Sequence, residues 1–282
     1  MTNVIAALGA DACAAPVLAT AKTLADMLDA TVVALHVGED RLPALEALAK
    51  AARVEFRQDQ GSSLERIVST ANEPGVVALV LGSRGATAGP RPAGATALEV
   101  MTRTAKPVVL VPPEARPPER FTRLLLPIEG QGAAPPALSH IIDAANRRQL
   151  EIIVLHLHSP ATVPAFSDHE PHGTRVWDQE FLARHLPLKP DRVTVLRRVG
   201  TPADDVPAVA EGIGAELIVL VWSQRLAKGR ARVVTRTLAS TRIPVLLLPT
   251  EPSIRPGTDS VHRRTTTTSR ARMRPSTTNG QI

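Results

Sequence analysis

A glycine-rich segment in the first half of the chain has the residue types that hold phosphate groups. Gly82-Ser83-Arg84-Gly85 follows an apolar run, and Gly94-Ala95-Thr96 opens a helical pattern. Glycines permit positive φ and let backbone N–H groups approach a phosphate, while the dipole of the following helix attracts negative charge. Glycines after a strand also simply make turns. The segment therefore indicates a candidate phosphate site, with a plain turn as the alternative.

Two further clusters of side chains could bind a ligand, and each also has a simpler, structural interpretation. The histidines with metal-like spacing are His156, His158, His169 and His172. His36 and His156 occupy equivalent strand positions, which favours a structural role for both. A basic cluster is formed by Arg225, Lys228, Arg230 and Arg232. A solvated helix face is a more common role for such a cluster than an anion site.

Covalent catalysis finds little support in the sequence. We find no nucleophile elbow, no paired Ser/His/Asp context and no Walker loop. Cys13 is the single cysteine, which excludes an intramolecular disulfide and fits a reducing compartment. Its Ala-rich surroundings favour a packing role over that of a reactive thiol.

The elements that position these residues form a repeat. Leu8 to His36 and Ile128 to His156 both span 28 positions (36 − 8 and 156 − 128). Residues 61–81 and 200–220 provide a second pair of equal spacings, each starting at glycine and ending at leucine. Equal spacing at separate landmarks predicts two copies of one unit of about 120 residues.

Each copy alternates apolar runs with helical patterns. Continuous β-branched runs, such as 31–37 and 151–157, are typical of strands buried on both faces. Ala-rich helices are expected at 14–30 and 134–148, and third helices begin at Ser62-Ser63 and Thr201-Pro202, which suit N-cap and N1 positions. The βαβαβαβαβ order predicts a parallel sheet with helices on both faces and a ligand beyond the carboxyl ends of the strands, at the switch point.

The predicted domains are residues 1–113 and 121–250, joined by a Pro-rich linker at 114–120. The linker overlaps the proline-rich stretch Pro112–Pro118 and is expected to be stiff and extended. The second half carries 19 additional residues between His156 and Gly200 (44 positions against 25 from His36 to Gly61). They fall at about 158–173 and predict a loop. Residues 251–282 lose all periodicity and are expected to be a disordered basic tail.

Composition bounds the possible partners. The chain is 44% apolar but 2% aromatic, so aliphatic residues must fill its core. Of the net charge of +6, the tail carries +4, from six arginines and two acids. No aromatic residue interleaves there, so we expect no specific nucleic-acid binding. The apolar runs are strand-length and no signal peptide is evident, which predicts a cytoplasmic protein without membrane association.

The chain resembles the universal stress protein family in its tandem form over residues 1 to about 250. The matching stretches are "VVALVLGSRG", "GATALEVMTRTAKPVVLVPP", "GTPADDVPAVAEGIGAELIVLV" and "IPVLLLPTEP". The resemblance implies five-stranded parallel sheets of order 3-2-1-4-5, often paired through the last strand. It also implies ATP binding in many members, through a G-x-x-G loop, nine residues, then G-Ser/Thr, with an Asp ending the first strand. Members without the loop do not bind nucleotide.

The first half departs from this pattern at three points. Gly82, Gly85 and Gly94 match, but eight residues separate the last two (86–93). Ala95 stands at the hydroxyl position, with Thr96 as the substitute. Gly9 stands at the Asp position, with Asp11 two residues further on. The resemblance implies phosphates on the loop backbone, charge from Arg84 and adenine against the backbone of Val37.

The second half has lost the loop. Val221 and Gln224 stand where the two glycines would be, Trp222 follows the first, and Ala231-Arg232 replaces Gly-Ser. A β-branched residue resists positive φ, and an indole is expected to crowd an approaching phosphate. Glu129 provides a carboxylate at the end of the first strand of the second half, but this half has no glycine loop to complete a nucleotide site.

The resemblance implies a non-enzymatic stress regulator whose first half binds ATP or AMP with Mg²⁺. One alternative is an interaction scaffold that binds no nucleotide. Another is a weak nucleotide hydrolase, for which Asp11 is the one candidate base. An intramolecular pseudo-dimer or a homodimer is expected.

Overall fold

The computed structural model describes residues 1–83, 92–128, 135–158, 171–186, 189–226 and 231–250, with the backbone alone given for 158 and 171–175. Glu129, His169, Lys228, Arg230 and the tail at 251–282 lie outside the described residues, as do Arg84 and Gly85 of the glycine segment.

The first half forms five parallel strands in the order β3-β2-β1-β4-β5. Their bounds are β1 (Asn3–Ala7), β2 (Thr31–Val37), β3 (Glu55–Asp59), β4 (Val76–Gly82) and β5 (Val108–Val111). The second half repeats this order as β8-β7-β6-β9-β10. Its strands are β6 (Arg123–Pro127), β7 (Glu151–His158), β8 (Val193–Val199), β9 (Leu217–Trp222) and β10 (Val245–Pro249). The expected 3-2-1-4-5 order is confirmed in both halves.

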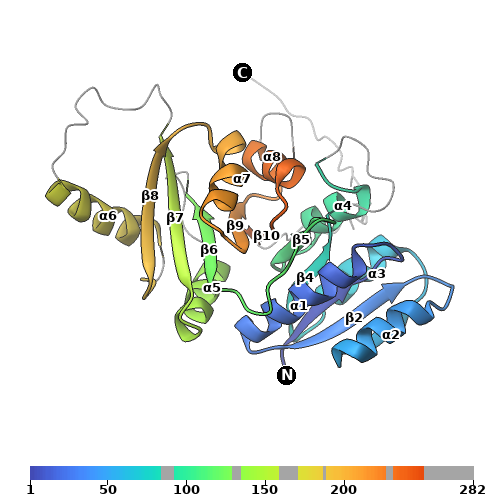
Figure 1. Ribbon diagram of the computed structural model, residues 1–282. Coiled ribbons are helices and arrows are strands. Elements are labelled where there is room, and N and C mark those ends of the chain that lie inside the picture. Colours follow the sequence, from blue (N-terminus) through green and yellow to red (C-terminus); the bar gives the residue numbers. More distant parts are fainter. Residues whose placement is uncertain (84–91, 129–134, 159–170, 187–188, 227–230, 251–282) are drawn as a thin grey trace, which may run out of the picture.

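The two halves join into one ten-stranded sheet through their last strands (Figure 1). Strand β5 pairs with β10 in antiparallel register, with Val109 opposite Leu246. Both residues are fully buried. Every other strand pair in the sheet is parallel. The halves are therefore paired within one chain through their last strands.

Helices cover both faces of the sheet, so each half has three layers (Figure 1). One face carries α1 (Ala14–Leu28), α2 (Pro43–Ala52), α5 (Pro136–Arg147) and α6 (Pro171–His185). The other carries α3 (Ser63–Ala71), α4 (Ala95–Arg103), α7 (Pro202–Gly212) and α8 (Arg232–Ser240). Strand residues alternate between the two buried clusters, as a doubly covered sheet requires. No helix in the described part of the chain combines the length and apolarity that a membrane crossing needs.

Three local expectations need correction. Ser62 and Thr201 do precede α3 and α7, but neither side chain makes a capping hydrogen bond. In α7 the hydrogen bond runs the other way, because the Asp205 carboxylate reaches back and accepts the backbone N–H of the N-cap residue Thr201 at 2.6 Å. Part of the segment expected as a loop is helical, because α6 begins at Pro171. The linker is not fully extended, since Ala115 donates its N–H to the Pro112 carbonyl and closes a turn.

Candidate functional site

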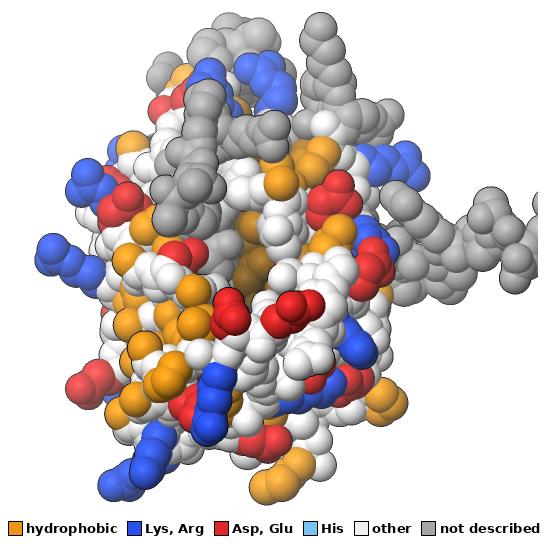
Figure 2. Space-filling model, turned by 90° about the vertical axis from the view of Figure 1, so that its right-hand side faces the viewer, with side chains coloured by type: hydrophobic (Ala, Val, Ile, Leu, Met, Phe, Trp, Pro, Cys, Tyr) orange, Lys and Arg blue, Asp and Glu red, His pale blue; other side chains and the backbone are white. Residues whose placement is uncertain are grey.

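A cavity of about 500 Å³ lies in the first half where β1, β2 and β4 end. Neighbouring strands β1 and β4 are followed by helices on opposite faces, α1 and α4, so their carboxyl ends mark the switch point of the sheet. Figure 2 views the side of the molecule on which β2 ends and shows a hollow there with hydrophobic side chains at its base. The cavity therefore occupies the place that the βα order predicts for a ligand.

Seven of the nine predicted site residues line this cavity. They are Gly9, Asp11, Val37, Gly82, Gly94, Ala95 and Thr96. The other two, Arg84 and Gly85, lie outside the described residues. Segments separated by tens of residues in the chain thus meet at one cavity, although sequence reasoning had linked them only through a family pattern.

The two ends of the glycine segment are joined at their base. Gly94 donates its N–H to the Ser83 carbonyl at 2.7 Å, and Ser83 donates its own N–H to Val111 at 2.8 Å. This pairing places the first turn of α4 beside the end of β4. The amino end of α4 therefore lies at the cavity, where the helix dipole and first-turn N–H groups, which have no acceptor within the helix itself, favour an anion.

Gly94 itself is not in the left-handed region. It is the N-cap of α4 with φ −62° and ψ 154°, so it does not use the positive φ that glycine permits. Its missing side chain instead leaves the wall of the cavity open at the N-terminus of the helix.

Asp11 supplies a carboxylate close to the position that the family pattern assigns to residue 9. Its Oδ1 accepts the backbone N–H of Cys13 at 2.9 Å. A Cβ added to Gly9 would lie 3.2 Å from Asp11 Oδ2. The carboxylate therefore comes from a residue two positions later in the sequence, but it lies close to the position of Gly9 after β1.

Cys13 lines the same cavity with a buried thiol. Burial, and next the negative charge of Asp11, raise the pKa of this thiol from 9.0 to about 11. The thiol is thus protonated at neutral pH, which supports the packing interpretation over a nucleophilic one.

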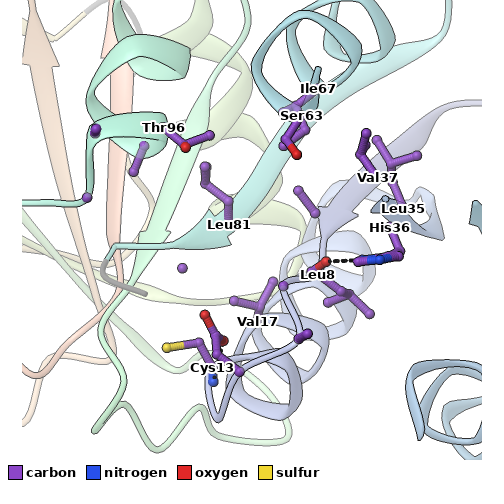
Figure 3. A pocket seen from close by; sticks show the side chains of 18 residues that line it. Leu8, Cys13, Val17, Leu35, His36, Val37, Ser63, Ile67, Leu81 and Thr96 are labelled. Atoms are coloured by element: carbon purple, nitrogen blue, oxygen red, sulfur yellow. Dashed lines mark hydrogen bonds between the residues drawn. The ribbon is translucent and has the colours of Figure 1, made fainter. Parts of the chain in front are cut away.

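Most of the cavity lining is apolar, and sequence reasoning missed these residues. Val17 comes from α1 on one side of the sheet, and Ile67 comes from α3 on the other, with Leu81 at the end of β4 (Figure 3). Ser63 and Thr96 add hydroxyl groups from the first turns of α3 and α4. The signal for Ser63 was present, because the first turn of a helix after β3 must lie at the same edge of the sheet.

The histidines at the ends of the second strands have the predicted structural role. His36 donates its Nδ1–H to the Leu8 carbonyl at 2.9 Å, seen as the dashed line in Figure 3. His156 makes the equivalent bond to Ile128 at 3.3 Å. Each imidazole ties the end of the second strand to the end of the first in its half.

The second half differs at every position of the loop, but two of the expected reasons are wrong. Val221 lies inside β9, so no positive φ is needed there. Trp222 is 5% exposed and packs in the core cluster that includes Val206 and Val234, so its indole does not lie in the solvent path of a phosphate. It fills core volume at the position equivalent to the small Ser83.

A metal site finds no support in the described part of the chain, where no three His, Cys, Asp or Glu side chains are grouped to hold an ion. The side chains of His158 and His172 are outside the described set. His156 instead packs against Phe181, with ring centroids 4.7 Å apart. Phe181 stacks on Trp177 at 4.8 Å, so α6 covers this imidazole with aromatic rings.

Comparison with known proteins agrees with this architecture. The model of the universal stress protein family matches residues 120–249. A functionally unknown protein of Pseudomonas aeruginosa PAO1, PA1789, has a similar structure, with a TM-score of 0.64, 15% identity and coverage of 89% of this chain and 93% of its own. A universal stress protein of Archaeoglobus fulgidus DSM 4304 gives a TM-score of 0.60 at 15% identity, covering 88% of this chain and 98% of its own.

A putative universal stress protein of Pseudomonas aeruginosa UCBPP-PA14 gives a TM-score of 0.63 at 14% identity, covering 88% of this chain and 93% of its own. At such identities these three structures establish a shared fold. A search of curated proteins found no match. The second half therefore matches the model of the universal stress protein family, and the whole chain shares the fold of these three structures.

Proposed function

We propose that the chain is a non-enzymatic stress regulator whose first half binds an adenine nucleotide, ATP or AMP. The observation that carries this proposal is the convergence of seven predicted residues on one cavity at the switch point of the sheet. A volume of about 500 Å³ falls within the usual range of small-molecule sites. The resemblance to the nucleotide-binding members of the family gives the ligand class.

The cavity offers distinct environments for the parts of a nucleotide. Its apolar part, lined by Leu35, Ile67 and Leu81, suits a base. The first turn of α4, with the Thr96 hydroxyl, offers N–H and O–H donors to phosphate oxygens. The Asp11 carboxylate can accept hydrogen bonds from ribose hydroxyls or ligate a Mg²⁺ that accompanies the phosphates.

No arginine or lysine among the described residues lines the cavity. Phosphate binding would therefore rest on backbone dipoles, on Mg²⁺ and on Arg84, whose position is a sequence prediction.

The first test is direct. The purified protein is denatured and the supernatant is chromatographed for ATP, ADP and AMP, and ligand-free protein is titrated calorimetrically with millimolar ATP–Mg. We expect a bound nucleotide or a saturable heat. If neither is found, the nucleotide-independent scaffold replaces this proposal. If ATP is consumed and Asp11→Ala abolishes the turnover, the hydrolase alternative replaces it.

A matched pair of variants locates the site. Gly82→Val introduces into the first half the residue that the second half has at the equivalent position, Val221. Gly82 ends β4 and lines the cavity, so a valine there suits the strand and adds bulk at the cavity wall. We expect affinity to fall about tenfold or more, which is ~1.4 kcal/mol. The reverse change, Val221→Gly, should leave affinity unchanged, and an equal loss in both variants would place the ligand elsewhere.

A further inference from the structure

Gln224 stands where the second half has lost its loop glycine, and it contacts the first half. Gly61 to Gly85 and Gly200 to Gln224 both span 24 positions (85 − 61 and 224 − 200). The side-chain amide of Gln224 donates to the Thr104 carbonyl at 2.7 Å and to the Met101 carbonyl at 3.1 Å. Both acceptors belong to the carboxyl end of α4.

The backbone of Gln224 is also unusual. Its φ is 55°, in the left-handed region where glycine is favoured. The second half thus keeps the glycine-like backbone of a loop position while carrying a long amide side chain. Such a conformation in a non-glycine residue persists only where surrounding contacts hold it. The two hydrogen bonds to α4 are contacts of this kind.

The acceptors explain why an amide is suited to this position. The last four carbonyl groups of a helix have no partner within the helix, and they carry the negative end of its dipole. One NH₂ group with two N–H bonds can satisfy two of these carbonyls. On the other side, Arg103 of α4 binds Glu65 of α3 at 2.8 and 3.0 Å. The carboxyl end of α4 is therefore held from both halves.

Helix α4 connects this contact to the candidate ligand site. Its first turn, with Gly94 as N-cap, lines the cavity, and its last turn lies against Gln224. A helix of nine residues transmits a displacement at one end to the other because its core face is close-packed through Ala97, Val100 and Met101.

We infer that Gln224 is a positioning residue through which the second half sets the placement of α4 and hence the affinity of the first-half cavity for its nucleotide. At this position the second half has a residue that supports the helix at the first-half site, in place of a ligand-binding glycine. The affinity part of this inference rests on the proposed function, whereas the contact with α4 does not.

The test compares four full-length proteins: wild type, Gln224→Glu, Gln224→Lys and Gln149→Glu. Gln224→Glu keeps the shape but replaces the donor with a carboxylate that faces two carbonyls. Gln224→Lys restores an N–H donor and a charge that the helix carboxyl end favours. Gln149 is a matched control, because it also has φ 55° and donates to a helix carbonyl, that of Asn146, but within the second half.

Two measurements are made on each protein: hydrogen exchange of the α4 amides without ligand, and ATP–Mg affinity by calorimetry. We expect Gln224→Glu to speed exchange in α4 and to weaken ATP about fivefold, a coupling typical of linked sites. Gln224→Lys should recover both, and Gln149→Glu should match wild type in both.

The two measurements separate failure of this inference from failure of the proposed function. Unchanged exchange in α4 of Gln224→Glu would overturn the inference, as would faster exchange with unaltered ATP affinity. If wild type binds no ATP, the proposed function and the affinity coupling both fail. In that case the exchange data alone still decide whether the second half holds α4.

Discussion

Asp11 and Cys13 lie together where α1 begins. The backbone of Cys13 holds the Asp11 carboxylate, and the Asp11 charge helps to raise the pKa of the Cys13 thiol. The Asp11 carboxylate accepts the Cys13 backbone N–H, which anchors it at the amino end of the helix. Its charge and the burial of the thiol both favour the neutral form of Cys13. Burial, and next the Asp11 charge, therefore keep the sulfur protonated and poorly reactive at neutral pH.

This pair makes a prediction about thiol reactivity. A pKa of about 11 in the folded protein, against the ordinary 9.0, lowers the thiolate fraction at pH 8 about a hundredfold. We therefore expect iodoacetamide to label native Cys13 at least that much more slowly than the same residue in the denatured protein, as followed by intact mass. Labelling should accelerate as the pH rises toward 11. Similar rates in native and denatured protein at pH 8 would contradict the raised pKa.

The same pKa difference fixes the sign of a stability effect. Below about pH 9 the thiol is protonated in both folded and unfolded chains, so Cys13 contributes no pH dependence. Between pH 9 and 11 the unfolded chain ionises and the folded protein does not. The unfolded state then binds fewer protons, and the free energy of unfolding falls as the pH rises through this window.

At the scale of elements, the sequence predicts most of the framework because the repeat provides two independent readings of it. Ala14–Leu28 and Pro136–Arg147 lie within the expected helices, and both halves of the sheet have the expected strand order. What failed was local chemistry that depends on tertiary context. Ser62 and Thr201 have the residue types of N-caps, but neither side chain caps its helix, and in α7 the Asp205 carboxylate accepts the backbone N–H of Thr201.

Some residues of the candidate site could be predicted from the sequence and others could not. Glycines and Asp11 could be found because backbone approach and carboxylate chemistry leave marks in the local sequence. Ile67 and Val17 could not, because an aliphatic residue that lines a cavity looks the same in sequence as one that fills a core. The role of Gln224 also had no local signal, since its acceptors lie more than 100 positions earlier in the chain.

The capping of α7 gives a prediction at this scale. A Cβ added to Gly200 would lie 2.1 Å from Asp205 Oδ2, so Gly200→Ala must displace the carboxylate that caps the helix. We expect a loss of about 1 kcal/mol in the free energy of unfolding, measured by urea denaturation. Gly212→Ala is the matched control. It adds a Cβ with nothing within 4 Å at the end of the same helix and should be neutral or stabilising. Equal effects of the two changes would show that Asp205 does not stabilise α7.

At the scale of the whole molecule, the two halves share more than a linker. The β5–β10 seam buries Val109 and Leu246 at the centre of one sheet. Ion pairs join the carboxyl ends of α1 and α5, where Arg148 contacts Asp29 at 2.7 Å and Arg147 contacts it at 3.3 Å. Thr23 of α1 also donates to the Pro118 carbonyl of the linker at 2.7 Å. The buried seam dominates this union, because exposed ion pairs contribute little on their own.

The continuous sheet predicts that both halves unfold as one cooperative unit, and the positions of the tryptophans allow a sharp test. Both tryptophans, Trp177 and Trp222, lie in the second half, so their fluorescence reports on that half, whereas far-ultraviolet circular dichroism reports on both. Leu24 is fully buried in α1 of the first half, and Leu24→Ala should cost about 2–5 kcal/mol. In a cooperative molecule this change must shift the tryptophan transition in urea as far as the dichroism transition, although it lies in the other half. If the fluorescence midpoint is unchanged while the dichroism curve becomes biphasic, the halves are independent folding units. The β5–β10 seam would then couple them too weakly for the second half to control the first-half site.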